Sequence, residues 1–479
     1  MVRKTKTLVG SVGVALVAAV VFPAAAGAAE ALAGFTEIDI TPPLGIALGG
    51  RGCTITHADG VLHPLGAGVT VLKDADGNTV VLVSFDLPGV SCRLGEEIRS
   101  GVAAKLGIAS EYVLLNCSHT HSGPMMYREI MAGCGEAAPD ERDYMKALAR
   151  RIVEAASAAA GNLRPVVVRF HEGRCDVGIN RRGKLPSGEM GMVPSPEAPY
   201  DPRVWIMHLT SPGGQTRAVI FSYACHPVIV YGYALSKISA EYPGVARREI
   251  RAALGQDVHV QFIQGAAGNI RPRVLADLKE RRFRKSTPQD VEHAGKELAS
   301  AVLKALSSDG RTGTLRLAAS MDQVSLRRGT PPPRKFYEDL LKTDQGRAAA
   351  AARYWLDRYD KGGPFEKGDR WPVGVIRLTQ DQWVLYFAGE PVIEWAKHAA
   401  EWFRDRSVVV WGYSQQVSGY LPVDEILDEG GYEVVTSNLY RVGTPAPLAP
   451  GLNEAIRGSV LRQIAKIEGA ATSRAQGRL

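Results

Sequence analysis

The stretch 113-VLLNCSHTHSGP-124 places two histidines directly after a short apolar run. Residues 113–116 predict a buried strand, which leads into the polar segment that carries His119 and His121. Two residues that are two positions apart on an extended segment project to the same side. Neutral imidazole is the commonest protein ligand for zinc. The pattern therefore predicts a metal site, with a hydrogen-bonded histidine pair as the alternative.

Two later segments also place a polar side chain directly after an apolar strand. Residues 219–224 lead into His226, and residues 383–387 lead into Glu390. In an α/β scaffold the carboxyl ends of strands are where sites are built. Glu390 has an alternative interpretation as an acidic residue at a helix start, where the helix dipole favours it.

The glycine-rich turn 265–269 follows a third apolar strand, predicted over residues 258–263. Successive backbone amides in such a turn can bind an anion or an oxyanion. The alternative is a plain turn that only joins a strand to a loop.

The pattern along the rest of the chain predicts an α/β fold. Strand–turn–helix units recur with hairpins between them, so we expect a mixed, layered β-sheet core with flanking helices in a single large catalytic domain. Further strands are expected at residues 35–40, 69–72, 80–85, 165–170, 204–209, 218–223, 373–378 and 408–411, and helices at 141–160, 243–254, 288–306, 391–403 and 452–467.

Composition is that of an ordinary globular protein. The 479 residues are 45% hydrophobic and 22% charged, which argues against disorder, a collagen-like repeat or a small disulfide-stapled scaffold. The 51 glycines and 28 prolines favour a loop-rich protein over a helical bundle.

The N-terminus has the pattern of a secretory signal peptide. A basic start is followed by the apolar run 8–22 and by small residues up to Ala28, so residues 1–28 are expected to be removed on export. The alternative is a membrane anchor, but the run is shorter than the roughly 20 residues that span a bilayer. The mature chain is expected in the periplasm or outside the cell, without a transmembrane segment.

The net charge of the mature chain bears on whether it binds nucleic acid. The formal charge is +7, and loss of Arg3, Lys4 and Lys6 leaves 54 basic against 50 acidic residues, or +4. Without a long basic block this does not indicate a nucleic-acid partner.

Of the six cysteines, Cys117 and Cys225 are expected to be buried thiols. One disulfide is expected among the other four cysteines, but the sequence does not show which two are joined. These four are Cys53, Cys92, Cys134 and Cys175.

Five motifs occur in the order found in the neutral/alkaline non-lysosomal ceramidase superfamily, which the chain resembles over residues 34–466. They are HTHSGP at 119–124, ISAEYPG at 238–244, GAAGNIRP at 265–272, GE at 389–390 and GYLP…GGYE at 419–433. Within this metallohydrolase domain, residues 327–371 are charged and proline-rich and are a possible insertion or lid. Residues 467–479 are expected to be a polar tail.

The resemblance implies a zinc ion held by His119, His226, Glu390 and Tyr420. It also implies that His121 faces the substrate. The same pocket would be lined by Arg181, Tyr432 and Asn269, with the backbone of Gly49 at its mouth.

Two departures from the family pattern stand out. Arg271 occupies the position of a serine in the family's loop, and the chain ends near where the family's immunoglobulin-like C-terminal domain would begin. Arg271 could pair with a carboxylate or phosphate on the substrate. The alternative is a structural ion pair to a neighbouring acid.

The predicted function is a secreted zinc hydrolase that cleaves an amide bond in a lipid-like or small N-acyl substrate, such as a ceramide-like sphingolipid. Zinc would lower the pKa of a bound water to about 7, and His121, Tyr420 and Arg271 would form the catalytic group. His121 would protonate the leaving nitrogen and Tyr420 would stabilise the oxyanion. The alternatives are a zinc hydrolase of another ester, amide or glycan-derived substrate, and a non-catalytic exported binding protein. The sequence does not indicate an oligomeric state.

Overall fold

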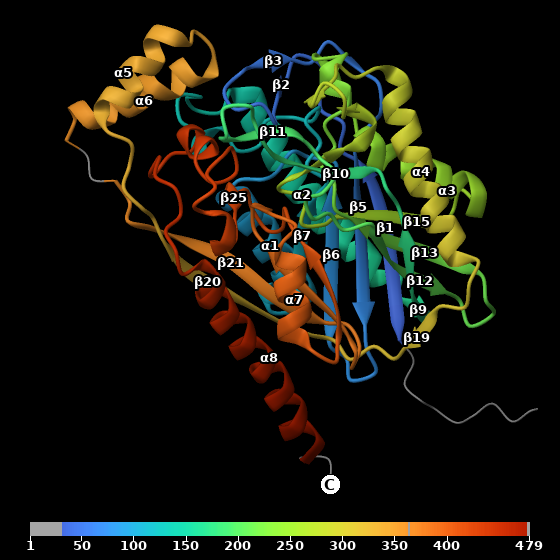
Figure 1. Ribbon diagram of the computed structural model, residues 1–479. Helices are drawn as coiled ribbons and strands as arrows, with labels where there is room; N and C mark the ends of the chain where they lie inside the picture. The colour runs from blue at the N-terminus through green and yellow to red at the C-terminus, as the bar shows by residue number, and fades with distance from the viewer. Residues whose placement is uncertain (1–30, 363–364, 477–479) are drawn as a thin grey trace, which may run out of the picture.

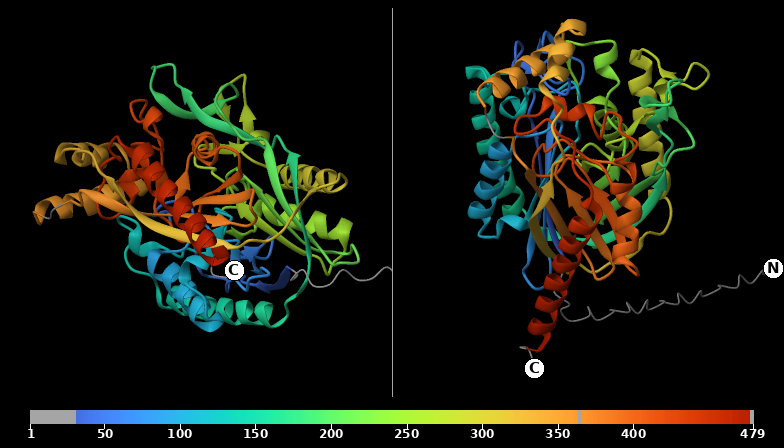
Figure 2. Two further views of the ribbon diagram at one scale, coloured as in Figure 1. Left: turned by 90° about the horizontal axis from the view of Figure 1, so that it is seen from below. Right: turned by 60° about the vertical axis from the view of Figure 1, so that its left-hand side comes forward.

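The histidine-bearing strand β7 (Val113–Cys117) lies at the edge of a five-stranded sheet in the computed structural model, which describes residues 31–362 and 365–476. The sheet order is β7-β6-β5-β1-β8, and β6 and β7 run parallel. Helices α1 (Cys92–Leu106) and α2 (Pro139–Gly161) cover its outer face (Figures 1 and 2). The other strands are β1 (Leu32–Asp39), β5 (Gly66–Lys73), β6 (Thr79–Phe85) and β8 (Arg164–Pro165).

A second five-stranded sheet, in the order β15-β13-β12-β9-β19, carries the strand that precedes His226. Its parallel pair is β13 (Thr216–Tyr223) with β15 (His259–Gln264). Helices α3 (Glu241–Leu254) and α4 (Pro288–Leu306) pack on it, on the opposite side of the molecule from α1 and α2 (Figure 2). The remaining strands are β9 (Val167–Arg174), β12 (Arg203–Thr210) and β19 (Arg311–Gly313).

A third sheet, in the order β20-β21-β22-β24, carries the strand that precedes Glu390. Its parallel pair is β22 (Gln382–Phe387) with β24 (Ser407–Trp411). Helices α7 (Trp395–Phe403) and α8 (Leu452–Gln476) pack on this sheet. Its other strands are β20 (Ala318–Arg327) and β21 (Gly368–Arg377).

The three sheets share one apolar layer. Leu82 and Leu114 of the first sheet, Ile220 of the second, and Val384 and Tyr386 of the third belong to the same buried cluster. This layer confirms the predicted α/β class with a mixed, layered core and flanking helices. Within the described residues, each helix is too short or too polar to cross a membrane.

Short ribbons complete the chain and contribute to the site. They are β2 (Ala47–Leu48) with β3 (Thr56–His57), β4 (Gly60–Val61) with β14 (Lys237–Ile238), β11 (Met190–Ser195) with β10 (Gly178–Lys184) and β16 (Ile270–Pro272), β17 (Ala276–Asp277) with β18 (Arg282–Phe283), and β23 (Glu390–Pro391) with β25 (Tyr420–Leu421).

Several expected elements differ in extent. Helix α7 begins at Trp395 rather than at residue 391, because Glu390 and Pro391 pair with β25. Helix α8 continues to Gln476, through most of the stretch expected to be a polar tail. Helix α1 was not predicted. The signal-peptide prediction falls outside the described residues.

The segment expected to be an insertion or lid forms two helices, α5 (Arg334–Thr343) and α6 (Arg347–Asp360), between β20 and β21. Tyr337 and Trp355 are buried there against Leu439 and Tyr440. The pair projects from the rest of the molecule in Figure 1. Its role as a lid stays a prediction.

One disulfide joins Cys53 to Cys134, within the set from which a bridge was predicted. Cys117 and Cys225 are buried free thiols, as expected, and burial raises the pKa of both. Cys92 is exposed and Cys175 is buried, both unpaired.

The Cys53–Cys134 bridge closes a loop with a sequence separation of 81 residues, so its removal should destabilise the fold. We expect the double variant Cys53→Ala/Cys134→Ala to lose about 2–4 kcal/mol of stability. For a chain of this length that corresponds to a fall of about 2–4 °C in Tm. Cys92→Ala, at an exposed thiol, is the matched control. Equal melting temperatures for all three proteins would contradict the bridge.

Candidate metal centre

Side chains from different sheets converge at the carboxyl ends of their strands. His119 follows β7 by two residues, His226 follows β13 by three, and Glu390 follows β22 by three. Tyr420 joins them because β25 pairs with β23, in a register that places Tyr420 opposite Glu390. The four predicted ligands are thus brought together from positions up to about 300 residues apart.

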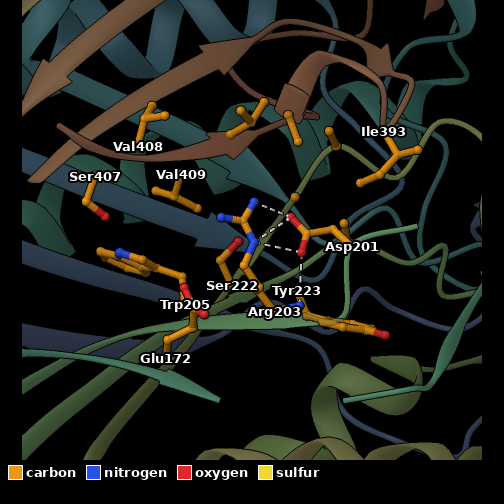
Figure 3. Close-up of a pocket in the computed structure, with 15 residues that line it drawn as sticks. Glu172, Asp201, Arg203, Trp205, Ser222, Tyr223, Ile393, Ser407, Val408 and Val409 are labelled. Atoms are coloured by element: carbon orange, nitrogen blue, oxygen red, sulfur yellow. Dashed lines mark hydrogen bonds and ion pairs between the residues drawn. The ribbon is translucent and has the colours of Figure 1, made fainter. Parts of the chain in front are cut away.

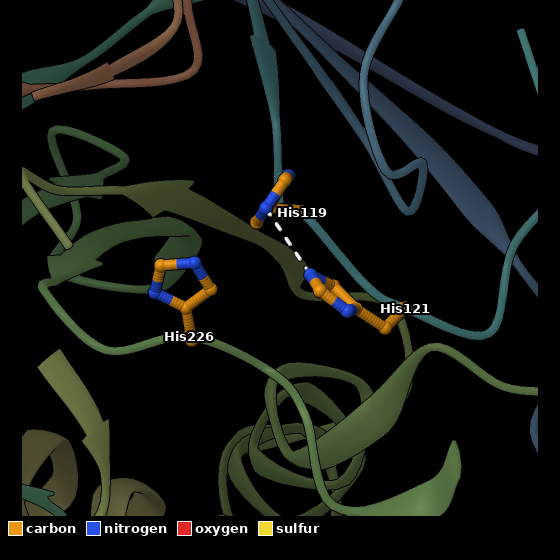
Figure 4. A group of neighbouring side chains, drawn as sticks. All are labelled: His119, His121 and His226. Carbon is orange, nitrogen blue, oxygen red and sulfur yellow. Dashed lines mark hydrogen bonds between the residues drawn. The ribbon is translucent and has the colours of Figure 1, made fainter. Parts of the chain in front are cut away.

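The ligating atoms lie within a few ångströms of one another. Glu390 Oε2 is 3.2 Å from His119 Nε2 and 3.2 Å from His226 Nε2. The Tyr420 hydroxyl is 3.5 Å from His226 Nε2, and His121 Nε2 is 3.2 Å from His119 Nε2. Figure 4 shows the three imidazoles around this common space.

Backbone carbonyls fix the tautomer of two of the histidines. His119 Nδ1 is 2.5 Å from the carbonyl oxygen of Pro88, and His226 Nδ1 is 2.7 Å from that of Ala267. A carbonyl oxygen can only accept, so each Nδ1 carries the proton and donates it. In the neutral rings, each Nε2 therefore turns an unprotonated lone pair towards Glu390.

A cation would fit at the centre of this arrangement. Two lone pairs and a carboxylate oxygen repel one another at 3.2 Å unless a positive ion or a proton lies between them. Four donors in a tetrahedral zinc site with bonds of about 2.0–2.1 Å lie about 3.3 Å apart. The donor set and its spacing therefore fit a single ion of this kind.

The electrostatics of the buried groups agree with their ligating forms. Burial opposes ionisation of Glu390, but the imidazoles of His119 and His226 hold its pKa well below the usual range. Burial, with the positive charge of Arg181 nearby, lowers the pKa of His226 to about 4, although Glu390 opposes this. At neutral pH the site thus holds a carboxylate beside a neutral His226.

His121 lies beside His119, as predicted, but the backbone between them is not extended as the prediction assumed. His119 has φ 66°, in the left-handed region, so the segment is not extended and the two-residue spacing alone does not set the side of the rings. The two imidazoles nevertheless face each other edge to face with centroids 4.9 Å apart. Burial and the neighbouring His119 and His226 hold the pKa of His121 well below its usual value.

An arginine–glutamate network holds Tyr420. Arg181 NH2 donates to the Tyr420 hydroxyl at 3.0 Å, and Arg181 Nε donates to Glu433 at 2.8 Å. Arg182 donates to the other oxygen of Glu433 at 2.9 Å. The Tyr432 ring lies 5.4 Å from that of Tyr420 and lines the same cavity, whereas Arg181 contacts Tyr420 from outside that lining; their contact with a substrate stays a prediction.

Two of the backbone amides of the glycine-rich turn 265–269, from which an oxyanion site was predicted, are already hydrogen-bonded within the protein. The amides of Gly265 and Gly268 already donate to the carbonyls of Tyr223 and Pro391. The turn instead supplies the Ala267 carbonyl that fixes the His226 tautomer. Asn269 is fully buried, and its side chain bonds Glu394 and the Ile393 amide, so it supports the turn rather than facing a ligand.

A cavity of about 80 Å³ opens onto the histidines. At its mouth the backbone is that of Gly50 and Gly52, whereas the expected Gly49 lies one residue outside the lining. A Cβ on Gly50 would lie 2.7 Å from His121 Cγ, and Gly50 has φ 88°, so glycine is required there. The lining also includes Arg347 and Tyr440, which no sequence motif indicated.

Sequence reasoning also missed Tyr413 and Pro88. The Tyr413 ring packs 4.4 Å from the ring of His119, and it follows β24 by two residues. Pro88 follows β6 by three. The signal that could have found them is the one used for the histidines, namely residues just after a buried parallel strand.

A second pocket lies between β12, β13, β24 and α7 (Figure 3). Two of its charged residues are paired with each other, because Arg203 donates to both carboxylate oxygens of Asp201. Since none of the four predicted ligands lines it, this pocket is separate from the candidate metal centre.

No protein-family model matches the chain, and no curated protein matches it. Solved structures do. A neutral ceramidase from Pseudomonas aeruginosa superposes with a TM-score of 0.70 at 17% identity, covering 92% of this chain and 75% of that one. The chain has the neutral ceramidase fold. A ceramidase complexed with C2 superposes with a TM-score of 0.67 at 16% identity, covering 90% of this chain and 74% of that one.

Glu241, in the ISAEYPG motif of this neutral ceramidase fold, supports the loop that follows His226. Its Oε1 accepts the amides of Ile229 and Val230 at 2.7 and 2.6 Å, while Oε2 is buried without a hydrogen-bond partner. Burial raises the pKa of Glu241 to about 7, although the two amides oppose this.

Because its pKa is higher in the folded than in the unfolded chain, Glu241 stabilises the protein fully at pH 4 and progressively less as the pH rises to about 7. We expect Glu241→Gln to abolish this pH-dependent loss of stability, which is about 3.5 kcal/mol for a pKa rise from 4.5 to about 7 at about 1.4 kcal/mol per pKa unit. Urea unfolding between pH 4.5 and 8 would measure it. Glu97→Gln, at an exposed position, is the control, and parallel pH profiles for wild type and Glu241→Gln would refute the assignment.

Proposed function

We propose that the chain is an exported, zinc-dependent hydrolase that cleaves an amide bond of an N-acyl substrate. The observation that carries the proposal is the convergence of two carbonyl-locked imidazoles and the Glu390 carboxylate on one point. The neutral ceramidase fold supports amide hydrolysis as the chemistry. The apolar N-terminal run and the Cys53–Cys134 bridge support export.

For the ligands we propose His119, His226, Glu390 and Tyr420. Histidines that bind metals almost always donate their second ring nitrogen to a carbonyl or carboxylate. His119 and His226 do so, whereas no hydrogen bond is seen at His121 Nδ1 among the described residues. That difference favours His121 as a residue that faces the substrate beside the metal.

When bound, zinc supplies Lewis acidity and lowers the pKa of a bound water to about 7. His121 is neutral at pH 7 because its pKa is lowered, so it can accept a proton from the attacking water. As the carbon–nitrogen bond breaks, His121 returns that proton to the leaving nitrogen. The products are a carboxylic acid and an amine.

We propose that Tyr420 also stabilises the oxyanion. Burial keeps the pKa of its phenol well above the usual value, so in the metal-free site the hydroxyl retains its proton. The hydrogen bond that Arg181 donates to the phenol oxygen strengthens the hydroxyl as a donor to developing negative charge.

A combined metal and activity measurement tests the proposal. Purified protein should contain about one zinc per chain, lose activity on treatment with a chelator, and regain it when zinc is restored. Activity would be screened on N-lauroyl amides with products separated by chromatography. A chain that neither takes up zinc nor hydrolyses any amide in the screen would overturn the proposal.

Single substitutions separate ligands from the proton-transfer residue. We expect His119→Ala and His226→Ala to lose both zinc and activity. His121→Ala should retain zinc but lose about 10²–10⁴-fold in kcat, the usual contribution of general acid–base catalysis. Zinc content by plasma mass spectrometry checks the first pair. Loss of zinc from His121→Ala would make His121 a ligand instead.

A further inference from the structure

Arg51 is a buried arginine without an acidic partner. It is 7% exposed, its NH2 donates to the Leu235 carbonyl at 3.1 Å, and its Nε and NH1 are buried without a hydrogen-bond partner. Each of the other buried arginines in the described part of the chain forms an ion pair with a carboxylate: Arg99 with Glu96, Arg128 with Glu141, Arg181 and Arg182 with Glu433, Arg247 with Asp86, and Arg328 with Asp369.

Arg271, at the position of the family's serine, is partly buried and also has no acidic partner among the described residues. Its NH1 is 3.6 Å from Met192 Sδ, its NH2 is 3.4 Å from the Tyr231 hydroxyl, and its Nε is buried without a partner. Its guanidinium lies 4.4 Å from the centre of the Phe283 ring. No carboxylate among the described residues pairs with it, so the predicted alternative of a structural ion pair is not observed.

Tyr231 connects both arginines to the candidate metal centre. Its ring lies 5.7 Å from the ring of His121, and its hydroxyl contacts Arg271. Burial lowers the pKa of Arg51, and the nearby phenols of Tyr231 and Tyr127 oppose this. Arg51 also follows Gly50, whose backbone packs against the His121 ring. The unpaired charges therefore lie near Tyr231, whose ring contacts His121.

Burying the Arg51 and Arg271 guanidinium groups without a carboxylate partner is unfavourable unless an anion binds to them. A guanidinium stays charged in a protein, and removing it from water without a counter-ion costs free energy. Paired with a carboxylate or phosphate, the same group forms strong charge-assisted hydrogen bonds. Aromatic faces and a thioether sulfur compensate only in part.

We propose that Arg51 and Arg271 form an anion-binding site for a carboxylate or phosphate on the amine part of the substrate. This rests on the proposed function, in which His121 protonates the leaving nitrogen. The amine part then lies beside His121, and its anionic group reaches the two arginines past Tyr231. The substrate class is therefore an N-acyl amino acid or an N-acyl aminoalkyl phosphate.

Matched substrate pairs test this site with the zinc-loaded full-length chain. N-lauroylglycine is compared with N-lauroylglycinamide for the carboxylate, and N-lauroyl-O-phosphoethanolamine with N-lauroylethanolamine for the phosphate. We expect wild type to prefer at least one anionic member by about 10-fold or more in kcat/KM. Arg51→Gln and Arg271→Gln should each lower that preference by about 10-fold or more, towards equal kcat/KM for the two members of a pair, because each loses a hydrogen bond to a charged group. Arg271→Lys should retain part of it.

Binding provides a measurement that does not depend on hydrolysis. N-dodecylglycine and N-dodecylglycinamide, in which a methylene replaces the acyl carbonyl, are titrated by calorimetry into wild type and variants of equal Tm. Arg203→Gln is the matched control, because Arg203 already pairs with Asp201 in the second pocket. It should leave the preference unchanged.

The outcomes distinguish this inference from the proposed function. Preferential binding of N-dodecylglycine that is lost in Arg51→Gln and Arg271→Gln supports the anion site, even if no amide is hydrolysed. Hydrolysis with equal kcat/KM for all charged and neutral members overturns the anion site and leaves the hydrolase in place. A preference that survives both substitutions also overturns it.

Discussion

Two imidazole lone pairs and one carboxylate directed at a single point are the constraint on which the rest of the site depends. The carbonyls of Pro88 and Ala267 hold the protons of His119 and His226 on the outer nitrogens, so the rings cannot relieve the repulsion by changing tautomer. Protonating an inner nitrogen instead is opposed by burial, which lowers the pKa of His226 to about 4. A bound cation would relieve this repulsion, and metal binding would then also stabilise the fold.

The sheets explain how so many groups meet in one place. Each of the three main sheets contains one parallel pair, and all six of these strands place a group at the site within three residues of their carboxyl ends. Two of them contribute a backbone carbonyl, from Pro88 and Ala267, and four contribute a side chain: His119, His226, Glu390 and Tyr413. The two strands of a parallel pair end on the same side of their sheet. Because the three pairs meet in one layered core, the residues that follow them come together at one site.

Features of the site that depend on a particular residue type could be predicted from the sequence. Features that depend on backbone geometry could not. Histidines after apolar strands could be recognised, but the carbonyls that fix their tautomers have no residue signature. Helix α1 was missed because Gly95 and Gly101 weaken its helical pattern. Gly95 is there for tertiary packing, since a Cβ would lie 2.2 Å from the Gln415 carbonyl oxygen. The short β23–β25 pairing, which sets Glu390 opposite Tyr420, joins two-residue strands too short to show a period.

His121 lies between the proposed metal ligands and the residues proposed to bind the amine part of the substrate. On one side are His119 and the other proposed ligands; on the other are Tyr231 and the unpaired Arg51 and Arg271. No hydrogen bond joins either arginine to a proposed ligand within the described residues. A serine-to-arginine difference at position 271 would therefore change which amine is accepted without altering the four proposed ligands. The convergence of the three sheets sets the positions of those ligands, whereas the proposed anion site beyond Tyr231 would select the substrate.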